Sequence, residues 1–276
     1  MWSRYREQLT ETRQPKGAKP MLFDAHIHLE KYDDDEIATM CADPSLVGMI
    51  AVSMDHASSR RTLALKKRCP EKVYAACGFH PEQPMTEQEA FMAWIEEKQQ
   101  EIDAIGEIGL PYYLRRERLA QGMDWNEDTY LSALDQWLRL AERLHKPVVL
   151  HGVREDVRTI LSYLDRYSLP NVQFHWLKTD VNTLCQLAER GIYVSFTPDL
   201  LYKEETRKIA TAYPRHLILL ETDGPWPHDG PWAGMRTHPR MLERVLDELA
   251  ILRGEESEPL RRALIENARR FIGSKG

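Results

Sequence analysis

Short apolar runs alternate with longer amphipathic segments along almost the whole chain, and this alternation limits the possible folds more than any other feature. Eight apolar runs are candidate strands, at residues 22–28, 48–54, 72–78, 102–108, 147–152, 171–176, 192–197 and 217–223. Helical patterns occupy 86–100, 127–146, 180–189, 238–253 and 257–272, and Gly191 follows the third of them where helices commonly end. Strands followed by helices predict a parallel sheet, and eight such units predict a (β/α)8 TIM barrel in the α/β class.

The length agrees with one barrel, since the chain has 276 residues and such barrels commonly have about 250. A doubly wound open sheet is the alternative, but it usually carries a glycine-rich phosphate-binding turn, and the sequence has none. We expect a single domain at residues 21–273. Residues 1–20 are polar and end in a Pro/Gly/Lys cluster, so we expect an N-terminal extension, with at most a short helix at residues 2–12.

Composition and charge indicate an ordinary globular protein, with 42% hydrophobic and 29% charged residues. The net charge of −6 argues against a large basic face for non-specific nucleic-acid binding. It leaves room for a nucleic-acid substrate, because bound metals can supply local positive charge. The four cysteines form no C-x-x-C pair, so we expect reduced, mostly buried thiols. The sequence has no apolar segment typical of a secretory signal or a membrane span, so we expect a soluble cytoplasmic protein that does not associate with a membrane.

The histidines cluster at one predicted end of the strands. Only His145 and His216 of the ten lie at strand entrances. The others fall at, or in the loop after, the carboxyl end of a predicted strand: His26, His28, His56, His80, His151, His175, His228 and His238. The carboxyl ends of barrel strands meet at the face where catalysis occurs, so this distribution predicts a functional site there.

The first strand ends in Asp24-Ala25-His26-Ile27-His28. Strand side chains alternate between two faces, so both imidazoles point the same way, with Asp24 one layer deeper. Two imidazoles on one face can bind a divalent cation. A pair of structural histidines explains this motif alone equally well.

Four more candidate ligands end later strands. Glu107 would be costly to bury without a cation or hydrogen bonds, and its two oxygens could bridge two metals about 3.5–4 Å apart. His151 and His175 end consecutive strands, and Asp223 could bind metal while one oxygen accepts a proton from water. Taken singly, each has a simpler explanation. Glu107 could form a salt bridge, and His151 and His175 could be structural histidines. Asp223 could cap the Gly-Pro turn that follows it. Their predicted placement at one face favours a metal site.

At this point the sequence resembles the TatD family of metal-dependent hydrolases, in the amidohydrolase superfamily. DAHIH, GFHPE, GEIGL, PVVLHG, VQFH and LETDGP occur in the family's order and approximate spacing, over about residues 21–273. The resemblance implies a (β/α)8 barrel with two divalent metals at its mouth. By matching positions it implies one metal on His26, His28 and Asp223, a second on His151 and His175, and Glu107 bridging both. It also implies that His80 lies beside the substrate.

The loops depart from the family pattern. Pro111 stands where the family usually has Asp, and residues 176–179 read Trp-Leu-Lys-Thr in place of a Cys-Phe-Ser-Gly-like turn. After His151, the usual Arg-Glu pair is displaced to Arg154 and Glu155, and the loop at 224–234 is rich in Trp. Such loops shape the choice of substrate rather than metal binding.

These observations predict a metal-dependent hydrolase, first of all a phosphodiesterase or deoxyribonuclease, since members of the resembled family act as metal-dependent DNases. Two divalent ions, with Zn, Mn, Mg, Fe, Ni or Co as candidates, would activate a water whose proton Asp223 accepts. The candidate substrate-binding residues for a nucleic acid or small phosphoester are His80, Arg154 and Lys178, with Trp226 or Trp232 stacking on a base. Solvated loop charges and ordinary packing are the simpler explanations of these side chains.

Two other classes of function remain open in the sequence. The same metal site could hydrolyse amide, lactone or acyl-ester bonds, as relatives of the family do, and the altered loops leave this possible. A non-catalytic metal-binding scaffold would be expected to lack a ligand, and none of the six is missing. No obligatory protein partner is readable from the sequence.

Overall fold

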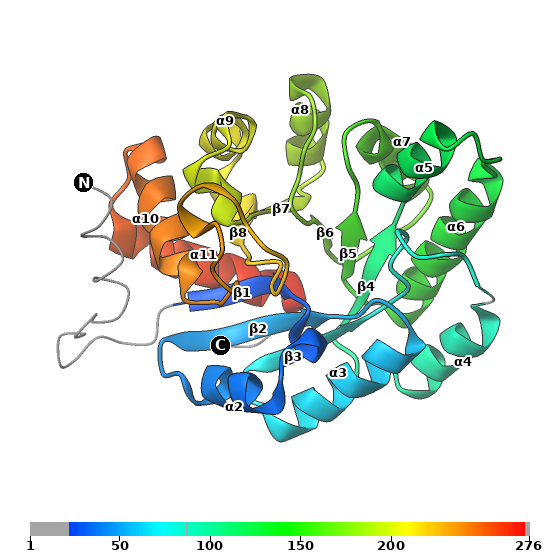
Figure 1. The fold of residues 1–276 in the computed structure, drawn as a ribbon, viewed down its shortest axis with the longest axis horizontal. Coiled ribbons are helices and arrows are strands. Elements are labelled where there is room, and N and C mark those ends of the chain that lie inside the picture. The colour runs from blue at the N-terminus through cyan, green and yellow to red at the C-terminus, as the bar shows by residue number, and fades with distance from the viewer. Residues whose placement is uncertain (1–21, 87, 274–276) are drawn as a thin grey trace.

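The fold is a barrel of eight parallel strands. The computed structural model describes residues 22–86 and 88–273. The strands pair in sequence order from β1 to β8, and each neighbouring pair is parallel. Figure 1 shows the strands at the centre with the helices arranged around them. The predicted (β/α)8 barrel is confirmed, whereas the expected extension at residues 1–20, with its helix, lies outside the described residues.

Each predicted strand is present, with ends that shift by a few residues. The strands are β1 (Leu22–Ile27), β2 (Leu46–Val52), β3 (Val73–Cys77), β4 (Ala104–Gly109), β5 (Val148–His151), β6 (Val172–Phe174), β7 (Tyr193–Phe196) and β8 (Ile218–Leu220). The largest shift is at β8, which ends three residues early at Leu220, and β6 ends two residues early, before His175. Trp176 has a positive φ of 39°, so the backbone is no longer extended there.

The helices fall between these strands and after the last one. They are α2 (Asp34–Ala42), α3 (His56–Arg68), α4 (Glu89–Glu97), α5 (Tyr112–Ala120), α6 (Glu127–Leu144), α7 (Glu155–Leu164), α8 (Val181–Glu189), α9 (Glu204–Ala212), α10 (Met241–Arg253) and α11 (Ser257–Ile272). Short 3-10 turns occupy Leu29–Lys31, Pro198–Leu201, Arg215–Leu217 and Gly230–Trp232. Gly191 has a φ of 68° just beyond α8, as its predicted place after that helix requires.

The barrel closes where the first and last strands meet. The backbone N–H of Asp223 donates to the carbonyl of His26 at 2.9 Å, and the N–H of His28 donates to the carbonyl of Gly224 at 2.7 Å. One layer deeper, the Asp24 carboxylate accepts the backbone N–H and the hydroxyl of Thr222. These bonds hold β1 and His28 beside the segment that follows β8, at the mouth of the barrel.

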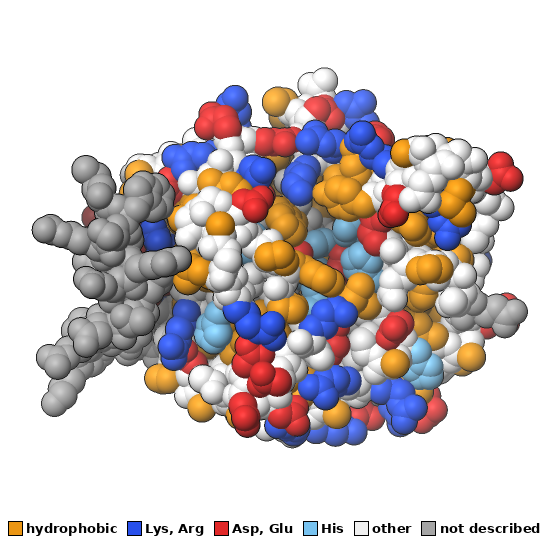
Figure 2. Space-filling view, in the orientation of Figure 1, with side chains coloured by type: hydrophobic (Ala, Val, Ile, Leu, Met, Phe, Trp, Pro, Cys, Tyr) orange, Lys and Arg blue, Asp and Glu red, His pale blue; other side chains and the backbone are white. Residues whose placement is uncertain are grey.

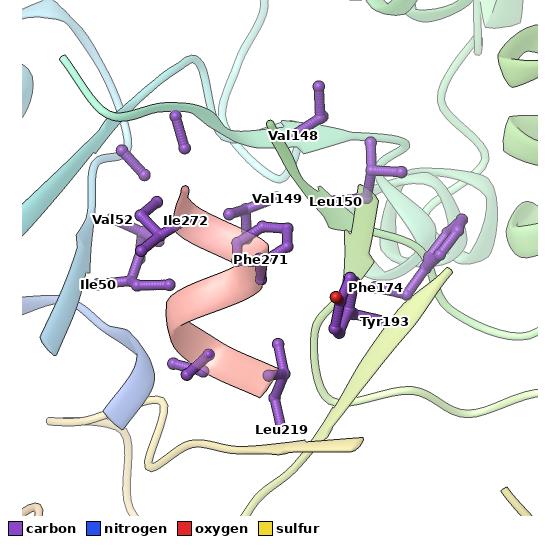
Figure 3. Packing of buried hydrophobic residues seen from close by; sticks show 14 of the residues in the cluster. Ile50, Val52, Val148, Val149, Leu150, Phe174, Tyr193, Leu219, Phe271 and Ile272 are labelled. Carbon is purple, nitrogen blue, oxygen red and sulfur yellow. The ribbon is translucent and has the colours of Figure 1, made fainter. Parts of the chain in front are cut away.

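The core is made by the apolar faces of the strands and the inner faces of the helices. On α6, buried Leu134, Leu138 and Ala141 recur at the spacing of one helical face. At the other end of the barrel, Figure 3 shows Phe271 and Ile272 of α11 among residues of β2, β5 and β8. This packing brings the last helix onto the barrel that carries the site.

Two local features place the site-bearing segments. A Cβ atom at Gly109, where φ is 155°, would clash with the carbonyl oxygen of His151, so only glycine lets β4 approach β5 this closely. At the start of α3, Asp55 caps the helix by accepting the backbone N–H of Ser58 at 2.7 Å. Such features fix the strand ends and loops that surround the mouth.

Two sequence expectations concern the molecule as a whole. The described structure has no helix long and apolar enough to cross a membrane. All four cysteines are free thiols, of which Cys69 and Cys77 are buried, Cys41 is half-buried and Cys185 is exposed. The expectation of mostly buried thiols is therefore correct for two of the four.

Candidate metal centre

Six side chains from five strand ends converge at the mouth of the barrel. His26 lies near the end of β1 and Glu107 within β4, both fully buried, and His151 is the last residue of β5. His28 and His175 follow directly after β1 and β6, and Asp223 lies in the loop after β8. No member is more than 7% exposed. The structure thus brings together all of the metal ligands that the sequence predicted.

Glu107 lies between two groups of ligands, and each of its oxygens faces one of them. Oε2 lies 3.2 Å from Nε2 of His26 and 3.6 Å from Nε2 of His28. Oε1 lies 2.7 Å from Nε2 of His175 and 2.9 Å from Nδ1 of His151. A carboxylate placed in this way can bridge two cations.

Asp223 completes the group on the Oε2 side. Its Oδ1 atom lies 3.4 Å from Nε2 of both His26 and His28. Asp223 has a φ of 51°, a left-handed conformation that is uncommon outside glycine and is found at functional sites. The hydrogen bond from its backbone to His26 holds the residue in this conformation.

The donor set fits divalent cations. His26 Nε2, Glu107 Oε2 and Asp223 Oδ1 are buried, face one another, and have no hydrogen-bond partner among the described residues. Buried polar atoms without a partner are costly, and a cation between them would satisfy all three. With metal–ligand bonds of about 2.0–2.2 Å, neighbouring ligand atoms lie roughly 3–3.5 Å apart. The separations of 2.7–3.6 Å in the two groups are close to this range.

The electrostatics keep the acidic members ionised. Burial opposes charge on Glu107, but the imidazoles of His175, His80 and His26 together bring the pKa of its carboxyl well below the usual value. For Asp223, burial is likewise outweighed by the imidazoles of His28, His26 and His175, so the pKa of its carboxyl is lowered. Burial lowers the pKa of His26, which favours the neutral imidazole that binds metals.

His80 lies beside this centre, as the sequence predicted. Its Nε2 atom is 3.3 Å from Oε1 of Glu107. Burial lowers the pKa of the His80 imidazole, more than the Glu107 carboxylate raises it, so the ring is neutral near pH 7. His80 can therefore donate one hydrogen bond toward a molecule bound at the mouth.

The cavity above the six side chains has a volume of about 410 Å³. Figure 2 shows pale-blue histidines and red acidic side chains at the bottom of a central hollow. Its lining includes His80 and Lys178, two of the predicted substrate-binding residues, as well as Trp226. Lys178 Nζ lies 4.5 Å above the ring of Trp176 and 3.4 Å from the hydroxyl of Tyr113. The cavity lining thus places the positively charged ammonium of Lys178 beside aromatic rings.

Two predicted substrate contacts do not lie in this cavity. Arg154 is outside its lining and faces Glu205, with 3.4 Å between their nearest charged atoms. Trp232 is 1% exposed, and its indole donates to the carbonyl of Pro198. Of the two tryptophans named as alternatives for stacking on a base, Trp232 is excluded, because its ring is packed inside the protein, and stacking by Trp226 stays a prediction.

The structure adds three residues that the sequence did not single out as functional. Glu82 lies in the cavity lining, 3.2 Å from Nε2 of His151. Glu221 accepts the backbone N–H of Trp176 at 2.7 Å and lies 3.6 Å from Nδ1 of His175. Trp176 itself lines the cavity, with its indole fixed on Asp199. Glu82 lies in the GFHPE motif and Glu221 in the LETDGP motif. The sequence therefore contained both residues in recognisable motifs, but it did not indicate which side chains they contact.

A (β/α)8 barrel with buried histidines and carboxylates at the carboxyl ends of its strands defines a class of protein, the metal-dependent hydrolases. The family model described as TatD related DNase matches residues 23–273. The chain belongs to the TatD family.

Similar proteins agree with this membership. An uncharacterized metal-dependent hydrolase of Haemophilus influenzae is 34% identical over 255 residues, covering 91% of this chain and 99% of the relative. The uncharacterized metal-dependent hydrolase YabD of Bacillus subtilis is 26% identical, with 91% of this chain and 99% of the relative covered. The crystal structure of the TatD homologue YjjV from Escherichia coli has a TM-score of 0.77 at 24% identity, covering 91% of this chain and 97% of that one, and shows the same fold.

Proposed function

We propose that this TatD-family hydrolase is a two-metal phosphodiesterase that acts on the ends of single-stranded DNA. The observation that carries the proposal is the placement of Glu107, whose two oxygens face two separate groups of histidines. One cation would be held by His26, His28 and Asp223, and the other by His151 and His175. Cations bound there would supply Lewis-acid activation of a water and of the scissile phosphoryl group.

The side chains around the centre have distinct tasks in this proposal. Asp223 remains ionised in the buried site, so its carboxylate accepts the proton of the attacking water. His80 donates a hydrogen bond to an anionic oxygen of the substrate. The ammonium of Lys178 offsets substrate charge, and the Trp226 indole, 39% exposed at the cavity, offers a face for a base.

The shape and charge of the mouth support a strand end as the substrate. The cavity is concave and about 410 Å³ in volume, which suits a terminal nucleotide better than the middle of a stiff duplex. With a net charge of −6, the chain offers little general attraction for nucleic acid, so affinity would depend on the mouth itself. The family description as TatD related DNase agrees with this substrate class.

A substrate screen with metal analysis tests the proposal. We expect the full-length protein, loaded in turn with Zn, Mn, Mg, Co, Ni or Fe, to cleave bis-p-nitrophenyl phosphate and end-labelled single-stranded oligonucleotides. His26→Ala and Asp223→Ala should lower the rate by at least about 100-fold, since each removes a ligand and Asp223→Ala also removes the general base. Turnover of ester, amide or lactone substrates alone would overturn the phosphodiesterase assignment and favour carbonyl chemistry at the same site.

A further inference from the structure

Glu82 is held rigidly at the edge of the metal centre. It follows β3, and its side chain is 16% exposed. Its Oε1 atom accepts the backbone N–H of Tyr113 at 2.8 Å, and its Oε2 atom accepts that of Leu114 at 2.6 Å. Both donors belong to the first turn of α5, where unpaired N–H groups attract an anion. The carboxylate therefore has a fixed position and negative charge.

This carboxylate determines which nitrogen of His151 carries the proton in the neutral ring. Oε1 of Glu82 lies 3.2 Å from Nε2 of His151. An ionised carboxylate only accepts hydrogen bonds, so Nε2 must be the donor. With a cation in the centre the ring is neutral, so its lone pair would be on Nδ1, which faces Oε1 of Glu107 at 2.9 Å and Nε2 of His175 at 3.2 Å. His151 thus presents a lone pair to the metal centre.

The backbone of Glu82 has the opposite effect on His80. Its N–H donates to Nδ1 of His80 at 3.2 Å, which makes that nitrogen an acceptor. In the neutral ring the hydrogen is then on Nε2, 3.3 Å from Oε1 of Glu107. His80 therefore presents a hydrogen-bond donor where His151 presents a lone pair.

We propose that Glu82 is a positioning residue that gives these neighbouring histidines opposite roles, His151 as a metal ligand and His80 as a hydrogen-bond donor. The inference rests on the proposed metal-dependent function of the same site. Distances alone do not separate the two rings, because ligand atoms of His80, Glu107 and His151 all lie within 4.8 Å of one another. The bonds made by Glu82 provide the distinction.

Three carboxylates lie near the outer nitrogen of a ligand histidine, that is, the ring nitrogen that faces away from the metal centre. Glu82 makes the shortest of these three contacts. In the described structure, Glu221 lies 3.6 Å from Nδ1 of His175 and Glu30 lies 3.8 Å from Nδ1 of His28. Both separations exceed a hydrogen bond, whereas that between Glu82 and His151 does not. A carboxylate bonded to the outer nitrogen of a ligand histidine orients the ring and raises its basicity.

Titration of the chelated full-length protein with Co²⁺, followed by its visible absorption spectrum, tests this assignment. Glu82→Ala should weaken Co²⁺ binding by about 10- to 100-fold, which is the usual loss of affinity when a hydrogen-bond partner of a ligand histidine is removed. The same variant should change the Co²⁺ spectrum. Glu82→Gln should lose less, because an amide oxygen can still accept from His151. His80→Ala should bind Co²⁺ within about threefold of the wild type, whereas His151→Ala should lose at least as much affinity as Glu82→Ala.

A matched control separates these effects from the loss of a helix cap. Asp180 caps α8 at the same mouth by accepting the N–H groups of Asn182 and Thr183, so Asp180→Ala should leave Co²⁺ binding unchanged. Wild-type affinity and spectrum in both Glu82→Ala and Glu82→Gln would overturn the positioning role. Equal losses in His80→Ala and His151→Ala would overturn the division of roles. A wild type that binds no Co²⁺ would instead refute the proposed metal centre itself.

Discussion

Glu107 shows how a single residue can organise a whole site. It is fully buried, yet its carboxyl stays ionised because histidines surround both oxygens. A buried carboxylate needs such compensation, since charge transferred from water into a protein interior is costly. The same arrangement makes Glu107 common to both groups of ligands, whereas His28 belongs to one of them.

This difference leads to a testable result. Glu107→Gln should lower affinity for both cations, by at least about 100-fold, since even outer partners of metal ligands cost 10- to 100-fold. His28→Ala should lower affinity for one. The measurement is the metal-to-protein ratio after equilibration at a fixed free metal concentration. Glu117→Gln, on the exposed side of α5, is the control and should keep the wild-type ratio. Equal metal content in Glu107→Gln and the wild type would contradict the bridging role.

At the scale of elements, the loops after the strands depend on how each helix begins. Asp55 starts α3 with a reciprocal pair of hydrogen bonds to Ser58, just after the strand that leads to the mouth. Met54, between β2 and this cap, accepts the backbone N–H of His80 through its carbonyl. The cap therefore contributes to the position of the loop that carries His80.

We expect Asp55→Ala to destabilise the protein by about 1 kcal/mol, the typical cost of losing an N-cap side chain. For a domain of this size, that corresponds to roughly 2–4 °C in the midpoint of thermal unfolding. Asp55→Asn should retain most of the stability, since its amide oxygen can still accept from Ser58. Circular dichroism melting curves of the three proteins measure the effect. An unchanged midpoint in Asp55→Ala would show that the cap is dispensable.

The elements also show what the sequence could predict and what it could not. The period of two along β1 was enough to place His26 and His28 on one face, and the apolar runs were enough to locate all eight strands. The partner of Glu82 was out of reach, because His151 lies 69 residues further along the chain. The choice between Trp226 and Trp232 was out of reach for a related reason, since composition does not tell which indole of a loop packs inward.

At the scale of the whole molecule, the two ends of the barrel have separate tasks. The mouth holds the candidate metal ligands, while α11 packs against the opposite end. Asn267 of that helix donates to the carbonyls of Arg215 and Ile218, next to the start of β8. Phe271 is fully buried there, and its ring lies 5.5 Å from that of Tyr193. Such a division lets stability and activity be changed independently.

Phe271→Ala should therefore lower the free energy of unfolding by about 3–5 kcal/mol, from lost burial and the cavity left behind. Phe271→Leu should cost less, because most of the volume remains. Urea denaturation gives the free energies, and metal content at a temperature where the variants are folded should match that of the wild type. A loss below about 1 kcal/mol in Phe271→Ala would contradict the tight packing seen in Figure 3.

The seam between β1 and β8 has a consequence for how the protein is made. Asp24 is hydrogen-bonded to Thr222, which lies 198 residues further along the chain. Beside this bond, the backbone N–H of Asp223 donates to the carbonyl of His26. A chain emerging from the ribosome therefore presents its first two histidines long before their carboxylate partner exists. The centre can be assembled only after the eighth strand has been synthesised, so nascent chains truncated before residue 218 would carry histidines but no complete cation cage.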